Sequence, residues 1–219
     1  MLAALAFVVL ATADPALANV RISHDANWTS DKRPIVVTVG SLAPVTIALG
    51  AESAVLAVPA TNEGTVVSVT VKLPGPEKPF TRRVVMVQGA SYLIRGNPCA
   101  RYEVVPQPAA RLPGPVVRFD TSKIPAKRHP LRVLEGFFDK SDQESAVVQA
   151  TLAKPGTSDP ITPGLSAMCA RSGASLVVVD AKRKVLIDEM VVLPEGRITT
   201  ITLSTSGAWT ATVGEAVPE

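Results

Sequence analysis

Apolar and polar residues alternate along much of the chain with the two-residue period of a strand that buries one face. In TVVSVTVKLPGP, the residues Val67, Val69 and Val71 fall on one face and Ser68 and Thr70 on the other, until a Pro-Gly-Pro turn ends the run. The shorter runs PIVVTVG and PVTIALG each stop at a glycine. This pattern predicts an all-β chain of short strands joined by tight turns.

Two distant stretches share one outline. Residues 80–97 (FTRRVVMVQGASYLIRGN) read as a strand, a turn at glycine and a second strand. Residues 180–207 (DAKRKVLIDEMVVLPEGRITTITLSTSG) repeat that order after a basic turn. We therefore expect one architectural unit to occur twice, with the second stretch forming the closing meander of a β-sandwich.

A proline-rich region separates the two units. The segments VVPQPAARLPGPVVRF and SKIPAKRHP lie between residues 98 and 130, and proline cannot donate a hydrogen bond to a central sheet ladder. We place a linker or edge segment at residues 106–130. The sequence thus predicts two tandem small antiparallel β-sandwich domains, Ig-like or jelly-roll-like, at residues 19–105 and 131–219.

The stretch SDQESAVVQATLAKPG fits two interpretations. Ser141 and Glu144 match a capping box that would begin a short helix over residues 142–153. The adjacent Val147 and Val148 also suit a strand. Because the surrounding sequence is strand-like, the strand is the favoured interpretation.

Composition and charge agree with sheets and argue against nucleic acid as a partner. The 219 residues are enough for two domains, and hydrophobic residues make up 47% while aromatic residues make up only 4%. The net charge is +3, and the basic residues lie in small clusters such as TRR and AKRK, as on solvated strand faces and turns. Aromatic stacking platforms for bases or sugars are scarce, since Trp28 and Trp209 are the only tryptophans.

The first residues, MLAALAFVVLATADPALA, read as an export signal. An apolar run is followed by a helix-breaking Asp14-Pro15 and then by small residues, which predicts a signal peptide at residues 1–18, cut after Ala18. A short uncleaved anchor or an N-terminal strand is the alternative, because the usual basic residue before the apolar run is missing. The run is shorter than the about 20 residues that a spanning helix needs, and every later apolar run is interrupted. We expect a periplasmic or otherwise exported protein with no membrane span after cleavage.

The chain has two cysteines, Cys99 and Cys169. In an oxidising compartment they can form a disulfide, which would close a loop of about 70 residues and contribute roughly 4 kcal/mol in the chain-entropy model. The alternative is two independent buried thiols. We expect the disulfide, which would tie the two halves of the chain together.

No motif for catalysis is found. The sequence has no nucleophile elbow, no zinc helix, no glycine-rich phosphate loop and no Cys-x-x-Cys. A dispersed serine, histidine and acid site would have to use His129 with Asp120 or Asp139, and a histidine in a solvated linker beside Pro130 is the favoured interpretation. We expect no catalytic residue.

No motif for a metal or cofactor is found either. A copper site would have to use His24, Met86, Met168, Cys169 and Met190. Outside the adjacent Met168-Cys169, no two of these soft ligands have a characteristic spacing, so the methionines are interpreted as core filler. We expect no metal, and no cofactor.

One resemblance adds to this picture. Residues 175–204, SLVVVDAKRKVLIDEMVVLPEGRITTITLS, give a strand, a basic turn, a strand, a glycine turn and a Thr-rich final strand. This order resembles the C-terminal domain of AlgF, a periplasmic accessory protein of alginate O-acetylation, and LAPVTIALG and RRVVMVQGASYLIRG lie where that family's first domain has equivalent strands. The resemblance implies a non-catalytic protein of two tandem β-sandwich domains that assists polysaccharide O-acetylation by contacting acyltransferases.

Three functional classes therefore remain. The favoured one is a non-catalytic exported accessory protein of an envelope assembly, which would bind another envelope protein through an exposed strand edge or apolar patch. The alternatives are a structural subunit of a larger surface or membrane-associated complex, and an enzyme with a dispersed triad.

Overall fold

The structure is a computed structural model, which describes residues 16–25, 33–73, 75–76, 78–97, 101–107, 114–134, 147–163 and 173–217. Within these residues, fifteen strands form three sheets, and the one helical element is a 3-10 turn, η1, at Ala126–Arg128. The prediction of an all-β fold is confirmed. No helix in the described ranges is long and apolar enough to cross a membrane.

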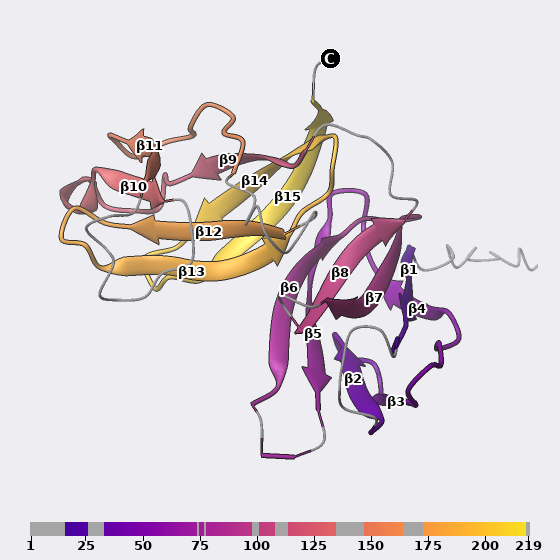
Figure 1. The fold of residues 1–219 in the computed structure, drawn as a ribbon. Helices are drawn as coiled ribbons and strands as arrows, with labels where there is room; N and C mark the ends of the chain where they lie inside the picture. The colour runs from indigo at the N-terminus through magenta and orange to yellow at the C-terminus, as the bar shows by residue number, and fades with distance from the viewer. Residues whose placement is uncertain are drawn as a thin grey trace, which may run out of the picture.

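The first unit has two layers (Figure 1). One layer is the four-stranded sheet β4-β1-β7-β8, and the other is the β6-β5-β2-β3 part of an eight-stranded sheet. Apolar side chains of both layers form the first core between them. The strands are β1 (Leu17–Ile22), β2 (Ile35–Val39), β3 (Val45–Ile47), β4 (Leu56–Pro59), β5 (Thr65–Lys72), β6 (Phe80–Met86), β7 (Ser91–Asn97) and β8 (Arg101–Gln107).

The second unit also has two layers. One is the three-stranded sheet β15-β14-β9, and the other is the β11-β10-β12-β13 part of the eight-stranded sheet. The second core lies between them. The strands are β9 (Val116–Asp120), β10 (Leu131–Leu134), β11 (Val148–Leu152), β12 (Gly173–Val179), β13 (Val185–Val192), β14 (Arg197–Leu203) and β15 (Trp209–Ala216).

The two units have the same topology. In the first, β1 runs parallel to β7, while β5-β6 and β7-β8 are antiparallel hairpins. In the second, β9 runs parallel to β14, while β12-β13 and β14-β15 are antiparallel hairpins. Two single bridges, Val117 to Ile161 and Asp120 to Thr157, take the place that β4 has beside β1. The two stretches that share an outline in the sequence therefore occupy equivalent positions, as β6-β7 and β13-β14.

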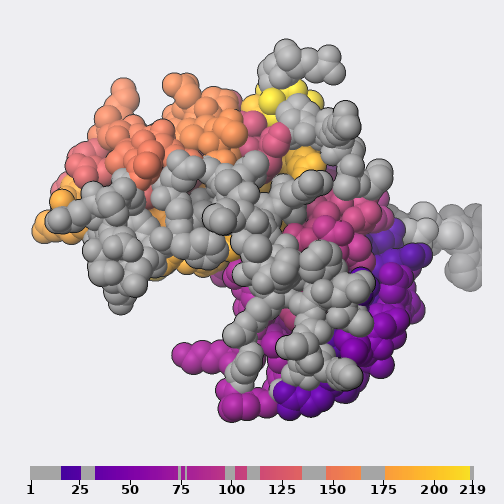
Figure 2. All heavy atoms as spheres, in the orientation of Figure 1, coloured from indigo at the N-terminus to yellow at the C-terminus, as the bar shows by residue number. Residues whose placement is uncertain are grey.

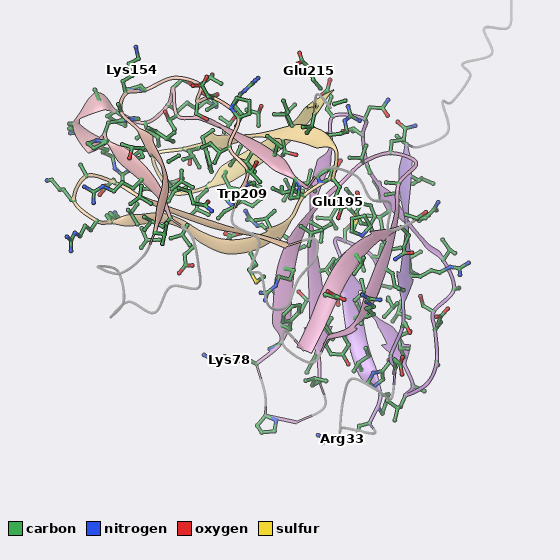
Figure 3. All side chains as sticks on the ribbon, turned by 45° about the horizontal axis from the view of Figure 1, so that its top comes forward. Arg33, Lys78, Lys154, Glu195, Trp209 and Glu215 are labelled. Carbon is green, nitrogen blue, oxygen red and sulfur yellow. The ribbon has the colours of Figure 1, made fainter. Side chains whose placement is uncertain are left out.

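The two units are joined by equivalent strands. β6 and β13 lie side by side and parallel, with Val84 opposite Val192, so the eight-stranded sheet runs through both units. Each core also contains a residue from the other unit. Val192 of β13 packs in the first core, and Val85 of β6 packs in the second. In Figure 3, Trp209 lies close to where the units meet, and its ring lies 4.9 Å from the guanidinium of Arg83 on β6.

Alternation in the sequence produces the buried faces. On β5, Val67, Val69 and Val71 are at most 5% exposed, while Ser68 between them is exposed. β-branched residues suit this pleated surface because their restricted rotamers pack well against neighbouring strands. The predicted inward face of this strand is confirmed.

The sequence predicts antiparallel sheets, but the strand pairing in the structure is mixed. Among the described strands, three pairs are parallel: β1 with β7, β13 with β6, and β14 with β9. A parallel neighbour requires a chain reversal through another layer, and a sandwich supplies it when the chain crosses from one sheet to the other. Local alternation contains no information about that crossing.

Three predictions about individual segments can be compared with the described strands. β11 shows that residues 148–152 form a strand, so the alternative of a helix over residues 142–153 is wrong for that part, and residues 142–146 lie outside the described residues. β9 lies within the predicted linker, residues 106–130, and buries Val117 and Phe119 in the second core. β1 begins at Leu17, inside the predicted signal peptide.

Candidate functional site

The outer edge of β11 and the residue before it carry two of the three exposed large hydrophobic side chains of the described residues. β11 ends the eight-stranded sheet and pairs with β10 on one side, and no described strand pairs with its other side. Val147 is 63% exposed and Val148 is 45% exposed. No charged residue occurs from Ser145 to Ala153, so the edge has none of the lysines that commonly protect such strands. Figure 2 places β11 and the segment after it at the margin of the second unit.

Packing on one side explains why β11 stays in the sheet. Leu152 is buried in the second core, and the strand matches β10 in register except at one bulge, where Leu134 pairs with Val148 after Val133 pairs with Ala150. A hollow of about 510 Å³ lies between β11 and the segment that follows it, lined by residues 150–159, Thr121 and Ile161. The strand is therefore anchored on its β10 side, with a hollow beside it.

A cleft of about 450 Å³, lined by polar side chains and by Val55, Tyr92 and Leu93, lies on the outer face of the first unit. Asn19 and Arg21 of β1 line it together with Glu52, Ser91 and Gln107. Within the described part of the chain, these five side chains form no hydrogen bond or ion pair with other protein groups. The cleft therefore presents one positive charge, one negative charge and neutral amide and hydroxyl groups to the solvent.

The proposed base pairing of His129 is not formed in the described region. Nδ1 of His129 bonds to the carbonyl oxygen of Leu152 at 3.0 Å, and Nε2 is buried with no partner among the described residues. Asp120 instead accepts hydrogen bonds from the Ser122 N–H at 3.0 Å and from the Thr202 hydroxyl at 3.4 Å. The bond from Ser122, more than any other contact, holds the pKa of Asp120 below its usual range. Asp139 lies outside the described residues.

Three of the residues considered for copper, His24, Met86 and Met190, lie in the described part of the chain, whereas Met168 and Cys169 lie outside it. His24 is 1% exposed, and both of its ring nitrogens are engaged, with the Arg33 carbonyl oxygen at 3.0 Å and the Tyr102 hydroxyl at 3.2 Å. Met86 is buried in the first core, in agreement with its interpretation as core filler. No group of three or more His, Cys, Asp or Glu side chains gathers within the described ranges in a way that would hold a metal ion.

The predicted disulfide is not tested by the structure. Cys99 and Cys169 both lie outside the described residues, as does Met168. The pairing stays a prediction.

A cluster of buried polar contacts around Asp180 was not predicted from the sequence. The Asp180 side chain is buried, with Oδ2 3.1 Å from Nε of Arg128, while Oδ1 accepts bonds from the N–H groups of Lys182 and Lys184. The signal was available in part, because an aspartate before a tight turn commonly bonds to the backbone two residues on. Arg128 also donates to the Thr205 carbonyl oxygen, so the cluster fixes three loops and is structural.

Comparison with known proteins adds no assignment. No family model matches this chain, and no curated protein matches it. The resemblance to AlgF therefore stays a prediction.

Proposed function

We propose that this chain is a non-catalytic exported protein that binds another protein of the cell envelope through the outer edge of β11. The observation that carries the proposal is the exposed, uncharged edge of β11, with Val148 on the strand and Val147 directly before it. An extended segment of a partner can add to such an edge by main-chain hydrogen bonds, while alternate side chains provide specificity. The partner's segment is expected to be a short strand with apolar residues at alternate positions.

The internal repeat provides a comparison. β3 is the equivalent of β11, because each ends its half of the eight-stranded sheet. β3 has only three residues, follows directly on Pro44 and presents an exposed Thr46. Short length and proline are standard ways of protecting an edge from pairing, and β11 has neither. Since the two edges have the same topology, the exposure of β11 is a property of its sequence and not of the fold.

The resemblance to AlgF supplies the class of assembly. Residues 175–204, which show the resemblance, form most of β12 and all of β13 and β14. On that basis we propose that the partner belongs to a machine that O-acetylates a polysaccharide, with an acyltransferase as the expected contact. The fold by itself does not identify the partner.

Co-purification with matched variants tests this proposal. Wild-type protein, Val148→Arg and Val55→Arg are isolated from the native envelope under mild detergent, and bound proteins are identified by mass spectrometry. Val55 is the control because it is 48% exposed, close to the value for Val148, but lies in the first unit. A charge on the β11 edge should lower partner recovery about tenfold, a loss of about 1.4 kcal/mol, whereas Val55→Arg should leave it unchanged.

Three outcomes decide between the proposals. An acyltransferase that is lost with Val148→Arg supports both the edge and the assembly. If the wild type and Val148→Arg recover every partner equally, and circular dichroism shows that both are folded, the proposal that the β11 edge binds the partner is overturned. An unrelated surface assembly at fixed stoichiometry overturns the O-acetylation role in favour of a structural subunit. Val147→Arg repeats the test at a site that is 63% exposed and outside the strand.

A further inference from the structure

β1 is an internal strand of the first unit, and its first residues are part of the fold. It lies between β4 and β7 in the four-stranded sheet. Leu17 pairs with Pro59 and Ala18 pairs with Val58. Ala18 is 0% exposed and belongs to the first core. The strand therefore starts before the position where the sequence analysis expects a signal peptide to end.

Backbone hydrogen bonds hold the residues on the N-terminal side of Asn19. The Ala60 N–H donates to the Ala16 carbonyl oxygen at 2.9 Å, and the Gly89 N–H donates to the Leu17 carbonyl oxygen at 2.8 Å. A cut after Ala18 would remove both acceptors and leave two donors without these partners, and an unpaired donor that stays buried is costly. It would also remove a buried side chain from the core.

A second small-residue site precedes the strand. Ala11-Thr12-Ala13 follows directly on the apolar run of residues 2–10. That run has the length of a signal-peptide hydrophobic region, and the order of apolar run and Ala-x-Ala site is the one that signal peptidases recognise. A cut after Ala13 leaves residues 16–22 intact.

We infer that the leader is removed between Ala13 and Asp14, so that the mature protein begins at Asp14. Water hydrolyses the Ala13–Asp14 peptide bond, which leaves a carboxylate on Ala13 and a free amine on Asp14. The inference rests on export, which is part of the proposed function. It differs from cleavage after Ala18 because that cut would take away two residues of β1.

The mature N-terminus tests the inference directly. The protein is isolated from the cells that make it, the cells are fractionated, and each fraction is examined by N-terminal sequencing and intact mass. Two matched variants are produced in the same cells: Ala11→Glu, which places a charge three residues before the inferred cut, and Ala16→Glu, which places one three residues before the alternative. We expect Ala11→Glu to lose processing, and wild type and Ala16→Glu both to begin at Asp14.

Each outcome has one meaning. Asp14 at the N-terminus, with processing lost only in Ala11→Glu, supports the inference. Asn19 at the N-terminus, with processing lost in Ala16→Glu, overturns the inferred cut and leaves export standing. An uncut chain in the envelope fraction also overturns the cut and leaves the proposed function standing. An uncut chain confined to the cytoplasm overturns export and the cut together.

Discussion

At the scale of single residues, Asp180 shows how one carboxylate orders several segments. Its side chain accepts bonds from Arg128, the last residue of η1, and from two N–H groups of the turn between β12 and β13. Burial by itself raises the pKa of Asp180, but the bonds from Lys184, Arg128 and Lys182, together with the charge of Arg128, outweigh it. The pKa of Asp180 is therefore lowered.

This lowered pKa gives a pH-dependent stability. A carboxyl whose folded pKa lies below its unfolded value of about 3.9 contributes stability above that pH and loses it as the pH falls through the folded pKa. Asp180→Ala should lower the free energy of unfolding by about 3 kcal/mol near pH 7, since it leaves a largely buried arginine unpaired. The difference in the free energy of unfolding between wild type and Asp180→Ala should become smaller below about pH 3.9.

Urea unfolding at a series of pH values measures this effect. Asp188→Ala is the control, because Asp188 is an exposed carboxylate on the neighbouring β13. A constant difference between wild type and Asp180→Ala down to the lowest pH would contradict the assignment of a lowered pKa.

At the scale of an element, the turn before β5 depends on a glycine. Gly64 has φ +88°, and a Cβ there would lie 2.7 Å from Cγ2 of Val213 and 2.9 Å from Cγ1 of Val85. Val213 is on β15 and Val85 is on β6, and the Val213 N–H donates to the Glu63 carbonyl oxygen. The turn therefore lies where both units pack against it.

Two glycine substitutions separate strain from packing. Gly50 has φ +78° but has nothing within 4 Å of a built Cβ. Gly50→Ala should cost about 1 kcal/mol from the left-handed backbone alone, whereas Gly64→Ala should cost about 3 kcal/mol because the crowding of two valines is added. Chemical denaturation measures both variants. Equal losses would show that the valines move aside freely.

For individual strands, the sequence predicts which face is buried better than it predicts which strands pair. The alternation on β5 is visible in the valine spacing, and the strand nature of β11 follows from Val147-Val148. The parallel contact of β6 with β13 could not be predicted, because it depends on side chains of two distant segments fitting together. The exposure of the β11 edge could not be predicted for the same reason, since it depends on which strand ends the sheet.

At the scale of the whole molecule, the two units are expected to unfold together. The shared sheet, and the exchange of Val85 and Val192 between cores, mean that one unit cannot open without exposing apolar surface of the other. The ion pair between Arg83 and Glu189 contributes little, because both side chains are about 40% exposed. Packing at the junction is therefore the main source of coupling.

Built-in probes can test this coupling. Both tyrosines, Tyr92 and Tyr102, are buried in the first core, and Trp209 is buried in the second. In a Trp28→Phe background, near-ultraviolet signals from tyrosine and tryptophan should give one urea midpoint. Val192→Ala should lower both midpoints by the same amount. Two separate midpoints would show that the units unfold as independent domains.

The two unequal ends of the eight-stranded sheet determine how an assembly could grow. With β3 three residues long and preceded by proline, and β11 five residues long, uncharged and free of proline, pairing is expected to proceed at one end only. Open-ended fibres require each molecule to offer a donor and an acceptor surface on different sides. Through its sheet, this protein is therefore expected to accept one strand and then stop, giving a complex of fixed size with one partner per molecule.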